Sequence, residues 1–221
     1  MAGVGIYGKL PAHGDFVQRN LPGSFTGPWD EWLQGALQGS REMVGAQWLD
    51  YYLTSPVWRF AFSAGVIDAH AWAGVLVPSV DSVGRYFPVT IAAPVPPKSN
   101  PFACIRDERA WYQALSDLAI EALQSALKVD ELIDRFPNFA GRPASISRSQ
   151  DRYGLVTISG VQLPGDDYPE LLKTLMTDVA ASFSVWWCAG SQHMAATSMV
   201  CHGLPDVSAY RHMLGAPELH W

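Results

Sequence analysis

Apolar residues recur along this chain with two different spacings, and each spacing predicts one kind of element. Short alternating or continuous apolar runs bounded by Gly, Pro or Ser are typical of β-strands. Apolar residues spaced three and four apart predict amphipathic helices. The expected strands are residues 4–7, 57–63, 71–77, 86–93, 153–159, 184–188 and 195–202. The expected helices are residues 28–38, 48–53, 107–126, 130–136, 168–182 and 207–214.

The order and spacing of these elements predict the fold class. The strands within residues 57–93 are joined by connections too short for parallel crossovers, so we expect them to pair antiparallel. Strands that occur in groups, separated by helices, favour an α+β fold over an alternating one. Residues 21–28 are rich in Gly and Pro and predict a turn, with the helix beginning at Pro28, whereas residues 137–150 are loop-like. We therefore expect a mixed, largely antiparallel sheet flanked by helices.

Composition narrows the class of protein. With 221 residues, 48% hydrophobic and 16% charged, the chain is expected to form one globular domain over residues 1–221. The net charge is -6 and the basic residues are dispersed, so nucleic acid and anionic membrane surfaces are not expected partners.

The chain also lacks the usual signals for export or membrane insertion. Residues 1–10 show no basic start followed by an apolar stretch, and the most apolar stretch, residues 61–80, is interrupted by Asp68, His70 and Pro78. Three unevenly spaced cysteines suit a reducing compartment. We therefore expect a cytoplasmic protein, and the sequence predicts no oligomeric state.

The first residues resemble the sequence motifs of nucleotide-binding loops. Gly3, Gly5 and Gly8 fit G-x-G-x-x-G, and residues 3–9 fit most of a Walker motif. However, Leu10 stands where the Walker motif needs a magnesium-binding hydroxyl, and the following Pro11 disfavours a helix start. Nucleotide binding is therefore not expected.

Catalytic and metal patterns are weak, and we expect no cofactor, no metal and no enzyme activity. Ser79 and Asp81 could form a hydrolytic triad with His70 or His202, but no G-x-S-x-G elbow occurs. A hydrolase that uses the turn over residues 79–85 remains an alternative. A zinc site would draw on Cys188, His193, Cys201 and His202, whose spacing matches no common paired motif.

Tryptophan is unusually frequent, with nine residues. Trp58 lies beside Arg59, and Trp186 beside Trp187. Neighbours on a strand point to opposite faces, so Trp186 and Trp187 can both be buried only if both faces of the sheet are covered. An uncovered face would make its tryptophan a candidate interface anchor, but burial under a helix is the favoured interpretation.

Two sequence blocks carry a family resemblance. The first is YGKLP-x-x-GDF at residues 7–16, and the second is PS-x-D-x-x-GR-x-FP at residues 78–88. Both are typical of the TagF family of type VI secretion-associated proteins, which this chain resembles. A looser match follows in the Trp-rich stretch at residues 184–205. The resemblance implies a mixed sheet flanked by helices, of longin-like type.

The resemblance also implies a function. TagF-like proteins are negative regulators that act after translation by binding the forkhead-associated scaffold protein of the type VI system. A structural component of the secretion apparatus is a further alternative. The candidate residues, which either bind the partner or support the motifs, are Lys9, Asp15, Phe16, Trp58, Arg59, Ser79, Asp81 and Arg85.

The turn over residues 79–85 admits two interpretations. In the structural one, Asp81 caps the turn, Gly84 takes a positive φ and Arg85 pairs with a carboxylate, either Asp81 or Asp15. In the functional one, Arg85 is a recognition group held by a stiff turn. Asp15 admits the same two interpretations.

Overall fold

The computed structural model describes residues 3–96, 99–139, 147–150, 156–159 and 165–217. Seven of the described strands form one sheet in the order β2-β1-β5-β4-β3-β8-β9, and every pairing between neighbours is antiparallel. These strands are β1 (Gly5–Gly8), β2 (Val17–Arg19), β3 (Trp58–Phe62), β4 (Ala71–Val77), β5 (Val89–Val95), β8 (Phe183–Cys188) and β9 (Thr197–His202). A separate hairpin pairs β6 (Ser147–Gln150) with β7 (Val156–Ser159).

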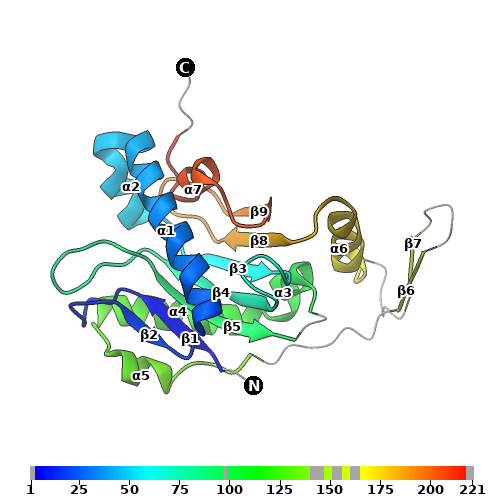
Figure 1. Cartoon of the computed structure of the whole chain (residues 1–221), viewed down its shortest axis with the longest axis horizontal. Coiled ribbons are helices and arrows are strands. Elements are labelled where there is room, and N and C mark those ends of the chain that lie inside the picture. Colours follow the sequence, from blue (N-terminus) through cyan, green and yellow to red (C-terminus); the bar gives the residue numbers. More distant parts are fainter. Residues whose placement is uncertain (1–2, 97–98, 140–146, 151–155, 160–164, 218–221) are drawn as a thin grey trace.

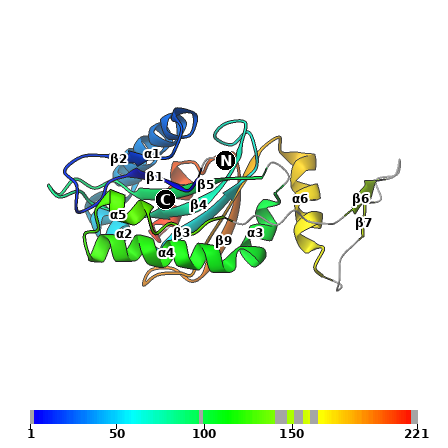
Figure 2. The same ribbon diagram turned by 90° about the horizontal axis from the view of Figure 1, so that it is seen from below.

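Helices cover both faces of the sheet (Figures 1 and 2). One face carries α1 (Gly23–Val44), a short 3-10 turn (Gly45–Gln47), α2 (Trp48–Thr54) and α7 (Val207–Met213). The other carries α3 (Pro101–Asp107), α4 (Arg109–Gln124) and α5 (Val129–Ile133), and α6 (Tyr168–Val179) packs against α3. The predicted α+β class, with a largely antiparallel sheet flanked by helices, is confirmed. No described helix is long and apolar enough to span a bilayer.

The core consists of two apolar layers, one on each face of the sheet. In β4, Ala73 and Val75 pack toward α4, whereas Trp72 and Leu76 pack toward α1, so all seven residues of the strand are buried. Such continuous burial is expected of a strand covered on both faces. The pair Trp186 and Trp187 follows the same rule, with one indole in each layer, and the favoured interpretation of burial is confirmed for both.

The first helix begins earlier than the sequence predicts. A turn was expected over residues 21–28, but α1 starts at Gly23 and Pro28 lies within it. The reason is that Phe25 continues the apolar stripe of Trp29 and Leu33 one turn upstream, and all three side chains are completely buried. Burial of an aromatic side chain offsets the backbone hydrogen bond that proline removes.

Other boundaries also differ. Strand β5 begins at Val89 rather than residue 86, because the preceding residues form the turn of the second sequence block, closed by a bridge between Val80 and Tyr86. Helix α3 was not predicted, although Asn100 caps it by accepting a hydrogen bond from the Phe102 amide at 3.0 Å. The short strand β2 was also missed, and β6 lies where a loop was expected.

Candidate functional site

Two loops that are far apart in the sequence meet at one end of the sheet. One joins β1 to β2 and the other joins β4 to β5 (Figure 1). The Ser82 amide donates a hydrogen bond to the His13 carbonyl oxygen at 2.9 Å, and Arg85 Nη2 donates to the Gly14 carbonyl oxygen. These loops contain the two sequence blocks that carry the family resemblance, so both blocks belong to one structural unit.

Asp81 is the centre of this unit. Its side chain is fully buried, and Oδ2 accepts hydrogen bonds from Lys9 Nζ at 2.8 Å and from Arg85 Nε at 2.7 Å. The second oxygen, Oδ1, accepts from the backbone amides of Val83 at 3.1 Å and Arg85 at 2.8 Å. One carboxylate therefore caps its own turn and ties it to the end of β1, as the structural interpretation of Asp81 predicts.

The charges in this cluster do not cancel. Burial alone raises the pKa of Asp81, but hydrogen bonds from Lys9 and Arg85 outweigh it and hold the pKa well below its ordinary value. Two cations thus share one carboxylate. The Lys9 side chain is 6% exposed and the Arg85 side chain is 55% exposed. The uncompensated positive charge is therefore presented to solvent mainly by Arg85.

Ser79 has a structural role in the same unit. Its hydroxyl donates to the Lys9 carbonyl oxygen at 2.6 Å. The Tyr52 hydroxyl donates to the Ser79 carbonyl oxygen at 2.8 Å and accepts from the Ser79 amide at 2.9 Å. No histidine ring of the described residues is hydrogen-bonded to Ser79, which is buried. This geometry gives no support to a hydrolytic nucleophile at this position.

The outer side of the two loops forms an exposed surface, here called the loop surface, made of Asp15, Phe16, Val83 and Arg85. Phe16 is 42% exposed and Val83 is 67% exposed. The Phe16 ring is nevertheless supported, because it packs edge-on against the buried Phe87 ring at 4.8 Å between centroids. Asp15 Oδ1 accepts a hydrogen bond from the Phe16 amide at 2.8 Å. Aromatic and arginine side chains are enriched among interface anchors.

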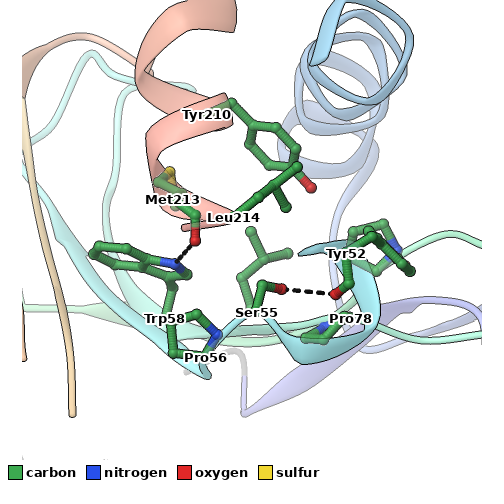
Figure 3. Close-up of a pocket in the computed structure, with 10 residues that line it drawn as sticks. Tyr52, Ser55, Pro56, Trp58, Pro78, Tyr210, Met213 and Leu214 are labelled. Carbon is green, nitrogen blue, oxygen red and sulfur yellow. Dashed lines mark hydrogen bonds between the residues drawn. The ribbon is translucent and has the colours of Figure 1, made fainter. Parts of the chain in front are cut away.

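The candidates Trp58 and Arg59 lie outside the loop surface. Trp58 is buried, and its Nε1 donates to the Met213 carbonyl oxygen at 2.9 Å (Figure 3). Both residues line a cavity of about 10 Å³, roughly the size of one water molecule. Trp58 is thus a core residue, as the favoured interpretation of burial under a helix predicts, and is not a surface anchor. Arg59 points to the opposite face, toward Ser116 and Gln113 of α4.

Gly8 of the first block allows close packing between neighbouring segments of the sheet. Gly8 has φ +133°, and a Cβ atom there would lie 2.1 Å from the Pro88 carbonyl oxygen of the neighbouring strand segment. In a nucleotide-binding loop, the lysine ammonium has to reach a phosphate. Here the Lys9 ammonium is buried and paired with Asp81. Both observations agree with the interpretation that this stretch is not a nucleotide-binding loop.

The residues considered for zinc are dispersed along a hairpin. The register pairs Cys188 with Thr197 at one end of β8 and β9, and Ser184 with Cys201 near the other end. No group of metal-ligating side chains occurs in the described part of the chain.

Comparison with known proteins identifies the family of this chain. Residues 5–138 match the TagF N-terminal domain, which is described as type VI secretion system-associated. The chain belongs to the TagF family. Its fold is also similar to the crystal structure of PA0076 from Pseudomonas aeruginosa PAO1, with a TM-score of 0.82 and 34% sequence identity over 98% of this chain and 96% of that chain. None of the curated proteins compared with the chain matches it.

Three contributors to this TagF site were not found by sequence reasoning. Tyr52 anchors the second loop from α2, and the His13 ring reaches α5 by accepting a hydrogen bond from the Val129 amide at 3.0 Å. Nothing in the sequence links these residues to the loops. The exposure of Val83 could have been predicted, because it is an apolar residue at the tip of a polar turn.

Proposed function

We propose that this TagF protein is a cytoplasmic negative regulator of type VI secretion that binds the forkhead-associated scaffold protein of that system and catalyses no reaction. Family membership supports the association with type VI secretion. The observation that carries the binding role is the arrangement at Asp81, where a buried carboxylate fixes Arg85 while the guanidinium group stays exposed.

The loop surface is the part of the site best suited to contact this partner. Phe16 is held by ring packing, and Arg85 by two hydrogen bonds in addition to the turn itself. Side chains that are already ordered lose less conformational entropy when they bind. An ordered aromatic ring and an ordered arginine on the loop surface therefore provide an apolar contact and a charged anchor for a protein partner.

The proposal is tested in cells that have an active type VI system. Deletion of the gene should activate secretion, and overproduction of the protein should silence it, because sequestration of a scaffold depends on the ratio of the two proteins. Secretion of the tube protein and of effectors into the medium, measured by immunoblot over a graded range of expression, provides the readout. Purification of the tagged protein from the same cells should also recover the scaffold.

Two outcomes would contradict this proposal. Unchanged secretion in both strains would exclude a regulatory role. Loss of secretion on deletion would instead indicate a structural component of the apparatus, the alternative considered from the sequence.

A further inference from the structure

A second site lies on the face of the sheet covered by α4. A cleft of about 510 Å³ opens between the start of β3, the middle of α4 and the turn that joins β8 to β9. This volume falls within the range of binding clefts. Its lining includes Arg59, Gln113, Ser116, Asp117, Ile120 and Gly190.

Arg59 is the cation in this cleft, and its charge is not paired at contact distance. Nε donates to Ser116 Oγ at 3.2 Å and Nη2 donates to Gln113 Oε1 at 2.9 Å, and both acceptors are neutral. Within the described residues, no carboxylate oxygen forms an ion pair with Arg59. Burial lowers the pKa of Arg59, partly offset by the charge of Asp117.

The surroundings hold this guanidinium in place and leave donors free. The Ser116 hydroxyl is fixed because it donates to the Tyr112 carbonyl oxygen at 2.6 Å, and Gln113 is fixed because its Nε2 donates to Asp117 Oδ1 at 2.8 Å. A guanidinium group has five N–H donors, of which these contacts use two. The opposite wall is rigid as well, since Gly190 has φ +93° and a Cβ there would lie 2.8 Å from the Met194 carbonyl oxygen.

The chemistry of the cleft selects a singly charged planar anion. A carboxylate matches the donor geometry of a guanidinium group and can bind it through two parallel hydrogen bonds. A phosphate dianion fits less well, because one cation faces it and Asp117 lies on the rim of the same cleft. The cleft therefore favours carboxylate over phosphate.

The exposure of the rim indicates the source of that carboxylate. Gln113 and Asp117 are exposed, and Ile120 is 38% exposed, so the cleft is open along α4. A small carboxylic acid would remain largely in water there, whereas an acidic side chain that projects from a larger molecule would also bring apolar surface onto Ile120. We propose that this cleft binds an acidic side chain of a protein segment, with its carboxylate on Arg59.

The proposal is tested on the folded protein by NMR titration that follows the Arg59 Nε–Hε and Ile120 methyl signals. The probes are a capped Gly-Glu-Gly peptide, its Gly-Gln-Gly counterpart and free glutarate. The Glu peptide should give saturable shifts with millimolar affinity, as expected for one charged anchor. The Gln peptide should give none, and glutarate should bind more weakly than the Glu peptide.

Variants separate this site from the loop surface. Arg59→Gln should weaken binding of the Glu peptide at least about tenfold, because the charged hydrogen bonds are lost. Asp117→Asn should tighten it, because a like charge is removed from the rim. Arg85→Ala should leave binding of the Glu peptide unchanged. The peptide titration therefore tests the cleft separately from the proposed contact between the loop surface and the scaffold.

Equal shifts with the Glu and Gln peptides, no saturation with the Glu peptide, or full affinity in Arg59→Gln at an unchanged melting temperature would each overturn the proposal. Tighter binding of glutarate than of the Glu peptide would also overturn it, because the cleft would then be a site for a small carboxylic acid.

Discussion

At the scale of single residues, one buried carboxylate holds the two loops of the site together. Asp81 satisfies two cations and two backbone amides, and Lys9 has almost no access to water that could replace it. Asp81→Asn should leave the Lys9 ammonium buried without a counter-charge, and the melting temperature should fall by about 10 °C. Asp15→Asn is the matched control, because Asp15 is exposed and, within the described part of the chain, bonds only its neighbour's amide. Its melting temperature should change by less than about 2 °C.

The effect of Asp81→Asn should depend on pH. The folded pKa of Asp81 lies below the value of about 3.9 expected for an unfolded aspartate. Its contribution to stability is therefore complete above that pH and is lost as the pH falls toward the folded pKa. Thermal melts of both proteins should show a constant gap near neutral pH that narrows below about pH 4. A gap that stays constant under acid conditions would show that the charge of Asp81 is not what stabilises the turn.

At the scale of elements, the end of β1 approaches the residue before β5 too closely for a side chain at Gly8. In Gly8→Ala the new methyl group would overlap the Pro88 carbonyl oxygen, and the positive φ adds strain, so we expect a loss of at least about 3 kcal/mol in the free energy of unfolding. Gly3→Ala is the control, since nothing lies within 4 Å of its Cβ position. Urea denaturation followed by tryptophan fluorescence measures both. Equal stability of the two variants would contradict the close packing described here.

Some elements could be predicted from local sequence alone, and others could not. β4 has a continuous apolar run and α4 a strong helical period, both with clear breaks, and the sequence places both at or near their observed bounds. α1 was predicted too short, because Pro28 signals a helix start locally, while the burial of Phe25 that extends the helix depends on the rest of the fold. A three-residue strand such as β2 has too few positions to show a period.

At the scale of the whole molecule, the topology of the chain brings the residues of the site together. The sequence blocks identified the residues and the family, and the capping role of Asp81 follows from ordinary turn chemistry. The ion pair between Lys9 and Asp81, which are 72 positions apart, could not be predicted. It depends on the chain reversals that bring the β1–β2 loop beside the β4–β5 loop. For Trp58, burial under a helix was predicted, but the covering helix, α7, could not be identified from the sequence.

The central proposal is that the fold holds the Arg85 side chain rigid so that the scaffold protein can recognise it. Purified wild type and Arg85→Ala should be compared by a binding titration with the forkhead-associated scaffold and by thermal melting of the same samples. Arg106→Ala provides the control, since Arg106 is similarly exposed and pairs with Asp107.

We expect Arg85→Ala to weaken scaffold binding by more than about tenfold. Its melting temperature should fall by no more than about 3 °C, because Asp81 keeps Lys9 and its backbone donors. Arg106→Ala should change neither quantity appreciably. A large fall in the melting temperature of Arg85→Ala, with unchanged affinity in the fraction that remains folded, would contradict the claim and make Arg85 a purely structural residue.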